Sequence, residues 1–291
     1  TFTDQDIIDI SNEKLIPVKI DAGTDEGMAL FNQFQGTAYP MIVFLDKNNN
    51  EIDRFYGYLP PYEFLIKIKN ALNNTGNLMY YLKQYNDGNH SAELIKSLAD
   101  KYKDKEEFDQ AISLYQELLL SSNVSKDDYQ YSKYTIASLS LRKNEPSVMI
   151  DYLNEYSSSS YVEQGVNDLI YFYQLNGQKK EEFSTYSQYI DQLQYSYNFL
   201  NNYAWRMSEL DTNLNDALEK INIGLSLINK ENSGYSYLID TKAEILWKLH
   251  DVQSAVNTIE EANCFGELIF LETLKNFSNL YISLKLPIFG P

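Results

Sequence analysis

The sequence is short of residues that carry chemistry. Its 291 residues include one cysteine, Cys264, and two histidines, His90 and His250. A single thiol cannot form an internal disulfide, and two histidines far apart in the chain do not assemble a zinc cluster. No glycine-rich phosphate loop occurs, and no apolar stretch approaches the roughly 18 residues of a membrane span. We therefore expect no cofactor, no bound metal and no membrane insertion, and we identify no catalytic residue.

Basic residues are also scarce. The chain has 24 Lys and Arg against 41 Asp and Glu, which gives a formal net charge of -17. Nucleic-acid binding needs clustered cations that neutralise phosphate, and an anionic membrane surface repels such a chain. We therefore expect no nucleic-acid partner. A hydrophobic fraction of 44% over this length is typical of a globular protein with two domains.

Residues 1–72 carry alternating strand and helix signals. Residues 15–21 form a short β-branched apolar run, which predicts a strand. Apolar residues at helical spacing predict helices over residues 24–34 and 62–72. Between these helices, runs at 41–45 and 51–57 flank an Asn-rich turn and predict a β-hairpin. The first and second of the three predicted strands are apolar on both faces, as interior strands covered by helices are.

The turn of this hairpin begins like a calcium-binding loop at Asp46. Glu51, however, stands where such a loop requires glycine, and Gly57 stands where it requires a bidentate glutamate. We interpret the segment as a hairpin turn. We likewise interpret Cys264 as a structural thiol and both histidines as residues of helix turns.

This order of elements, with Tyr39 and Pro40 directly before the hairpin, resembles the C-terminal three-quarters of a bacterial thioredoxin-like protein. The resemblance covers residues 1–72 and implies a partial thioredoxin-like α/β fold. It also implies a cis peptide bond before Pro40, with Tyr39 and Pro40 on the substrate side. The sequence departs from the family because it has no Cys-x-x-Cys motif, and the strand and redox helix that carry that motif are missing. We therefore expect that Thr1 is not the natural N-terminus.

The missing strand leaves a gap in the expected sheet. In the family's strand order it lies between the predicted strands at 15–21 and 41–45. Interior strands need partners on both edges, since a buried backbone group without a hydrogen bond costs about 1–3 kcal/mol. We expect a further strand there, from residues preceding Thr1 or from another chain. The 291 residues alone should then have an unstable N-terminal domain.

The rest of the chain is predicted to be all-α. Residues 73–90 read as a linker with turn formers at 73–77 and a short helix at 78–83. From 91 to 291 helices recur with a period, most clearly at 92–119, and the pattern resembles a tetratricopeptide (TPR) repeat. The resemblance implies a solenoid of stacked helical hairpins, closed by a capping helix at 265–284. Equivalent positions in its five units are Ala111, Val148, Phe183, Ala217 and Ala255.

In the tetratricopeptide family a concave groove is lined by the first helix of each repeat. The groove positions, carried onto this chain, hold amide, aromatic and acidic residues: Gln164, Asn167, Tyr171, Asn198, Asn201, Trp205, Tyr237, Asp240, Glu244 and Trp247. Amides bond an extended peptide backbone and aromatic rings supply buried area, which indicates a peptide-binding groove. No paired basic residues are present to hold a C-terminal carboxylate. The alternative is that Trp205 and Trp247 pack between neighbouring repeats.

Two functions remain open at this point. In the first, the protein acts in protein–protein interaction and binds client proteins or peptides through the solenoid groove. In the alternative, the complete protein is a thiol–disulfide oxidoreductase whose Cys-x-x-Cys lies upstream of Thr1, and the chain as given is inactive. We favour binding for this chain. Its abundance of Asn, Lys, Ile and Tyr suggests a bacterial origin, and we favour the periplasm or cell envelope over the cytoplasm.

Overall fold

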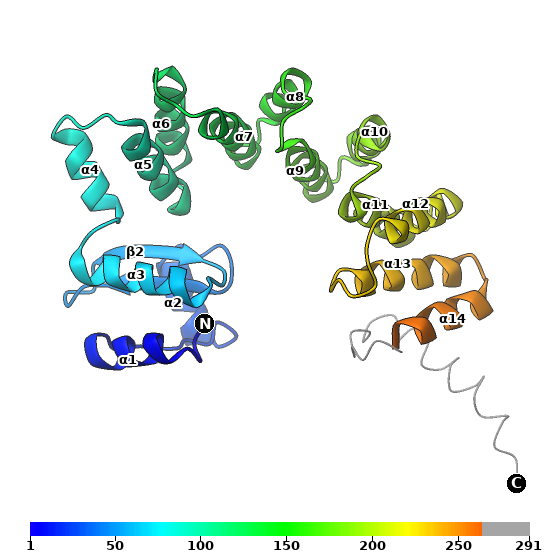
Figure 1. Cartoon of the computed structure of the whole chain (residues 1–291), viewed down its shortest axis with the longest axis horizontal. Coiled ribbons are helices and arrows are strands. Elements are labelled where there is room, and N and C mark those ends of the chain that lie inside the picture. Colours follow the sequence, from blue (N-terminus) through cyan, green and yellow to red (C-terminus); the bar gives the residue numbers. More distant parts are fainter. Residues whose placement is uncertain (264–291) are drawn as a thin grey trace, which may run out of the picture. The chain divides into compact units, whose positions relative to one another are not determined.

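The computed structural model describes residues 1–263 (Figure 1). It is mostly helical, and its contacts divide the chain into two compact units, Thr1–Val148 and Met149–Pro291. The first unit begins with α1 (Gln5–Lys14), α2 (Asp25–Gln33), β1 (Met41–Leu45), β2 (Glu51–Tyr56), α3 (Pro61–Asn73) and α4 (Leu78–Asn86). The expected linker at 73–90 therefore lies inside the first unit, and its predicted short helix is α4.

Over the described residues ten further helices follow as consecutive pairs. They are α5 (Ala92–Asp104) and α6 (Phe108–Leu120), α7 (Lys126–Arg142) and α8 (Pro146–Glu155), α9 (Val162–Leu175) and α10 (Lys179–Tyr189), α11 (Tyr197–Glu209) and α12 (Leu214–Ser226), and α13 (Tyr235–Lys248) and α14 (Val252–Asn263). The division between the two units falls within α8. Cys264 and the expected capping helix at 265–284 lie outside the described residues.

β1 and β2 form the antiparallel hairpin that the sequence predicts. Met41 pairs with Tyr56 at its open end. At the turn, Asp46 Oδ1 accepts hydrogen bonds from the backbone N–H of Asn48 at 2.7 Å and of Asn50 at 2.9 Å. The carboxylate that a calcium loop would use is thus hydrogen-bonded within the turn, and the interpretation as a hairpin turn is confirmed.

The hairpin packs with α1 and α3 around a small apolar core. Phe55 of β2 meets Phe64 of α3 edge-on, with ring centroids 5.6 Å apart. The sequence analysis did not predict α1, which is capped by the Asp4 side chain and fixed in the core by Ile7. The buried side chains of this core are Ile7, Phe44, Phe55, Phe64, Ile68 and Ala71.

The predicted strand at residues 15–21 is wrong. These residues form neither helix nor strand. The side chains of Ile16, Val18 and Ile20 are 91%, 71% and 51% exposed. In the described part of the chain β1 pairs with β2 alone, so the segment has no neighbour with which to exchange main-chain hydrogen bonds. β-Branched residues favour a strand only when a ladder exists to hold them.

Each helix pair from α5 to α14 is closed by the same kind of turn. The second residue past the end of each first helix adopts a left-handed backbone, with φ between 52° and 65°. The next residue then donates its N–H to a carbonyl five positions back, as Glu107 does to Tyr102 and Asp251 does to Leu246, both at 2.9 Å. This is the hydrogen bond of a Schellman motif, which ends a helix sharply. The left-handed residues are Glu106, Asn144, Gly177, Asp211 and His250.

The predicted repeat positions are correct in three pairs and one residue off in two. Ala111, Ala217 and Ala255 have no exposed surface on α6, α12 and α14. In α8 and α10 the corresponding fully buried residues are Met149 and Glu182, whereas Val148 and Phe183 are only partly buried. Neither methionine nor glutamate is a small residue, so the sequence pattern did not mark these positions.

Within residues 1–263, two ion pairs with a buried carboxylate join different elements of the fold. Lys101 Nζ of α5 lies 2.5 Å and 2.6 Å from the two carboxylate oxygens of Asp53 on β2, and both residues are 7% exposed. Arg206 Nε of α11 lies 2.6 Å from Oε1 of Glu182 on α10. The first pair ties the hairpin to the first helix pair, and the second ties two successive pairs together.

Candidate functional site

The predicted groove residues all lie on α9, α11 and α13, the first helices of three successive pairs. On each helix they recur every three or four residues and therefore share one face. α9 carries Gln164, Asn167 and Tyr171, α11 carries Asn198, Asn201 and Trp205, and α13 carries Tyr237, Asp240, Glu244 and Trp247. We call this set the first-helix face.

Contacts at both ends show that α11 and α13 run parallel. The first turns of both helices contact the same residue, Gly224 of α12. A Cβ built on Gly224 would lie 3.2 Å from Leu238 of α13 and 3.7 Å from Leu200 of α11. Near their last turns, Lys248 Nζ donates to the carbonyl oxygen of Ser208 at 2.8 Å. The selected residues of α11 and α13 therefore follow one another in the same direction along two neighbouring helices.

The first-helix face combines exposed aromatic and amide groups with partly buried tryptophans. Tyr171 and Tyr237 are 57% and 58% exposed. Trp205 and Trp247 are partly buried. Trp247 packs against the core formed by residues of α13 and α14, so it has a structural role besides any role in binding. Asn201 Oδ1 is buried and accepts no hydrogen bond from the described residues.

A pocket of about 480 Å³ opens at the C-terminal end of α13. Glu244 and Trp247 of the first-helix face line it, together with residues that the sequence analysis did not select: Asp211, Lys248, His250 and Val252. Asp211 and His250 are the left-handed turn residues of two successive pairs. Their equivalent positions in the repeat are a signal that could have identified them.

Glu244 is the most buried charged residue of the first-helix face, at 9% exposure. Burial raises the pKa of its carboxyl group, and the nearby Asp240 acts in the same direction. Lys248, whose Nζ lies 3.8 Å from Oε1, opposes the rise in pKa. The ionised form of Glu244 is therefore less favourable in the folded state than in the unfolded chain.

We expect Glu244→Gln to raise the unfolding midpoint of the second unit at pH 8. A carboxyl group whose folded pKa exceeds its unfolded value of about 4.3 lowers stability as pH rises through the folded pKa. The increase in the free energy of unfolding should be no more than about 1 kcal/mol and should vanish as pH falls towards 4. Fluorescence of Trp205 and Trp247 against denaturant reports it. Glu219→Gln on α12, where the side chain is 67% exposed, is the matched control. A Glu244→Gln protein less stable than wild type at pH 8 would contradict the expectation.

Tyr39 and Pro40 lie in the first unit, directly before β1. Their peptide bond is cis, as the thioredoxin resemblance implies. The Tyr39 ring stacks on Phe31 of α2 with centroids 4.5 Å apart and is 60% exposed. The carbonyl oxygen of Pro40 accepts the N–H of Gly57 at 2.9 Å, which holds the loop to the open end of the hairpin.

The structure offers few other candidates for chemistry. Within residues 1–263 no group of three or more His, Cys, Asp or Glu side chains is placed to hold a metal ion. His90 lies at the turn between α4 and α5, where its Nδ1 is 3.2 Å from Glu117. None of the helices over the same residues has the length and apolarity that a membrane crossing requires.

The fold is similar to the crystal structure of BtubC (BKLC) from P. vanneervenii, with 14% sequence identity and a TM-score of 0.47. The match covers 74% of this chain and 90% of that chain. Similarity at this level does not assign a function. No protein-family model and no curated protein matches the sequence.

Proposed function

We propose that this chain is a tetratricopeptide-like protein that binds extended segments of partner proteins on the first-helix face. The observation that carries the proposal is that all ten groove positions, carried over from the tetratricopeptide resemblance, fall on the first helices of three successive pairs. Repeated helix pairs cannot bury their apolar faces singly, and their stacking presents an extended surface suited to peptides.

The chemistry of the first-helix face supports a peptide ligand. Asn and Gln side chains carry both a donor and an acceptor, so they match the N–H and C=O groups of an extended backbone. Tyr171 and Tyr237 offer large rings at low entropic cost, and such residues dominate binding energy at interfaces.

We also propose that α2, β1, β2 and α3 belong to a thioredoxin-like fold, of whose sheet the described residues form only the β1–β2 hairpin. The order of helix, hairpin and helix, with Tyr39 and Pro40 directly before β1, supports this assignment. The sequence holds one cysteine and no Cys-x-x-Cys. This part of the chain is therefore proposed as a structural or binding domain, without thiol–disulfide chemistry of its own.

The double variant Tyr171→Ala, Tyr237→Ala tests the first-helix face. A displayed library of random 12-residue peptides is first selected on the wild-type protein, and the affinity of the enriched peptides is then measured. We expect the double variant to bind at least about 30-fold more weakly, since each aromatic anchor contributes about 1–2 kcal/mol. Both side chains are more than half exposed, so the fold should be unaffected.

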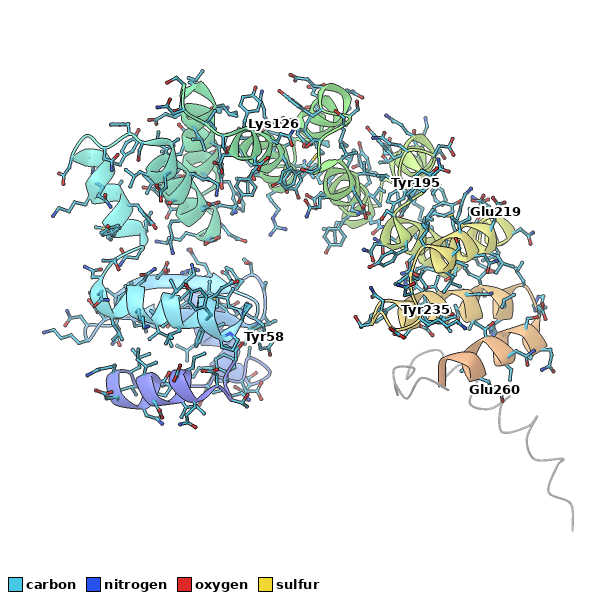
Figure 2. All side chains as sticks on the ribbon, viewed as in Figure 1. Tyr58, Lys126, Tyr195, Glu219, Tyr235 and Glu260 are labelled. Atoms are coloured by element: carbon cyan, nitrogen blue, oxygen red, sulfur yellow. The ribbon has the colours of Figure 1, made fainter. Side chains whose placement is uncertain are left out.

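Tyr195→Ala is the matched control for this experiment. Tyr195 is 79% exposed and lies between α10 and α11, outside the first-helix face (Figure 2). Its replacement should leave affinity within about twofold of wild type. Equal loss in the control and the double variant, or unchanged binding in the double variant, would reject the first-helix face as the binding site.

A further inference from the structure

The pocket that opens at the C-terminal end of α13 lies between the fourth and fifth helix pairs, both of which belong to the second unit. We call it the α13 pocket. The turn after α11 contributes Asp211 to its lining, and α13 contributes Glu244 and Trp247. At about 480 Å³ the α13 pocket has room for a long side chain of a bound peptide.

Glu244 gives the α13 pocket a buried carboxylate that lacks a hydrogen-bond donor. The residue is only 9% exposed. Among the described residues its ion-pair partner is Lys248, whose Nζ lies 3.8 Å from Oε1 and therefore beyond the range of an N–H···O hydrogen bond. Buried charged groups are ordinarily paired and hydrogen-bonded, because burial without a partner is costly. The carboxylate of Glu244 is thus placed to accept hydrogen bonds from a group that enters the α13 pocket.

The ammonium group of Lys248 is engaged elsewhere. Its Nζ donates to the carbonyl oxygen of Ser208 at 2.8 Å. Ser208 lies in the last turn of α11, and its carbonyl oxygen also accepts the N–H of Asp211 at 3.0 Å. Cations are favoured at such a helix end, because the last carbonyl groups carry a partial negative charge. Lys248 therefore stabilises the end of α11 and makes no direct hydrogen bond to Glu244.

The repeat offers a comparison for this arrangement. Glu106 is the left-handed turn residue of the first pair, as Asp211 is of the fourth. Arg142 and Lys248 both stand two residues before the left-handed residue of the next pair, and Arg142 Nη2 lies 3.5 Å from Oε1 of Glu106. Within residues 1–263 Asp211 has no such ion pair, because Lys248 is bonded to Ser208 instead. The α13 pocket therefore has two carboxylates, neither of which receives a hydrogen bond from a described cation.

Trp247 lines the same pocket one helical turn after Glu244. A guanidinium group stacks on an aromatic ring and donates two hydrogen bonds from its edge to a carboxylate, which an ammonium group cannot do in the same way. We propose that the α13 pocket receives an arginine side chain of the bound partner, with its guanidinium bonded to Glu244, stacked on Trp247 and close to Asp211. This proposal rests on the proposed binding function of the first-helix face, to which Glu244 and Trp247 belong. The net charge of -17 favours the approach of a basic partner.

The test uses the peptide acetyl-Ser-Thr-Arg-Thr-Ser-amide and the same peptide with citrulline, which has nearly the shape of arginine but no charge. The chain has two tryptophans, so an NMR spectrum contains two indole N–H signals, which a Trp205→Phe variant assigns. Titrations at pH 8 favour the ionised carboxylate. We expect the arginine peptide to shift the Trp247 signal and the citrulline peptide to bind at least about tenfold more weakly.

Three variants that each remove one carboxylate show which charge is recognised. Glu244→Gln keeps the shape of the side chain and should weaken binding of the arginine peptide about tenfold. Asp211→Asn, at an exposed position, should weaken it about threefold. Glu219→Gln on α12 (Figure 2), outside the α13 pocket, is the matched control and should leave affinity within about twofold of wild type.

Equal binding of the arginine and citrulline peptides to the wild-type protein, or unchanged binding in Glu244→Gln, would overturn the proposal. Tighter binding of a peptide with glutamate in place of arginine would show that the α13 pocket takes an anion through Lys248 and His250 instead. Neither Tyr171 nor Tyr237 lines the α13 pocket, so their double alanine variant should bind the arginine peptide normally. Failure of this proposal is thereby distinguished from failure of the proposed function, which that double variant tests with the selected peptides.

Discussion

Replacing Lys101 with methionine should destabilise the first unit by about 3–5 kcal/mol, because it leaves the Asp53 carboxylate buried without its direct ion-pair partner. The Lys101 ammonium lies within 2.6 Å of both Asp53 oxygens, and each residue is 93% buried. Lys67 and Asp104 lie near enough to interact electrostatically with Lys101. Removing one partner of such a pair costs far more than the pair itself contributes.

Amide exchange in β2 and α5 measures this loss, because it reports on the first unit separately from the second. Lys105→Met, at the partly exposed cap of α5, is the matched control and should cost less than about 1 kcal/mol. Replacing both partners, Asp53→Leu with Lys101→Met, should restore most of the stability. A loss below about 1 kcal/mol in the single variant would show that the pair is solvated and not buried.

A second readout follows from the effect of Lys101 on its neighbour. Burial and, next, repulsion by Lys101 lower the pKa of Lys67. Removing Lys101 should therefore raise the Lys67 pKa towards its ordinary value. Titration of the Lys67 ammonium by NMR would detect this change even if the loss of stability were partly compensated.

Arg206→Met should destabilise the second unit by about as much as Lys101→Met destabilises the first. Glu182 has no exposed surface, and its Oε1 accepts from Arg206 Nε at 2.6 Å and from Gln174 Nε2 at 2.9 Å. Hydrogen bonding to Glu182 and, to a lesser extent, to Glu209 raises the pKa of Arg206, so its charge is present at every accessible pH. We expect loss of the guanidinium to cost about 3–5 kcal/mol, measured as a lower denaturation midpoint of Trp205 fluorescence.

The repeat itself provides the control for this prediction. Glu182 occupies the position held by alanine in three other pairs. Adding Glu182→Ala to Arg206→Met removes the buried charge and should recover most of the lost stability. Lys180→Met, at an exposed position of α10 in the same unit, is the matched control and should cost less than about 1 kcal/mol. If the double variant were no more stable than Arg206→Met, packing and not charge would explain the loss.

Much of the helical part could be predicted from the sequence because its signals are local. The turn of a helix pair is set within six residues, as the left-handed Gly177 shows. Small residues mark the positions where two helices of a pair touch, as Ala111 does. The first-helix face was placed by the resemblance to tetratricopeptide repeats, and the three-residue and four-residue steps between its members keep them on one side of each helix. Its role in binding remains our proposal.

Some features could not be predicted because they depend on partners far along the chain. The run Ile16 to Ile20 has the composition of a strand, yet it has no strand beside it with which to form a ladder. Asp53 and Lys101 are 48 residues apart, and no local pattern links them. The pocket beside Glu244 likewise needs the turns of two pairs to come together.

By itself, therefore, the sequence determined the helix pairs, their turns and the hairpin, because each depends on hydrogen bonds and apolar spacing within a short stretch. Only the tertiary structure decided that residues 15–21 stay unpaired, that Met149 and Glu182 hold the repeat positions, and which charges are buried together. The physical reason is the same throughout. A strand, a buried charge and a pocket each need a partner that the chain supplies only after it has folded.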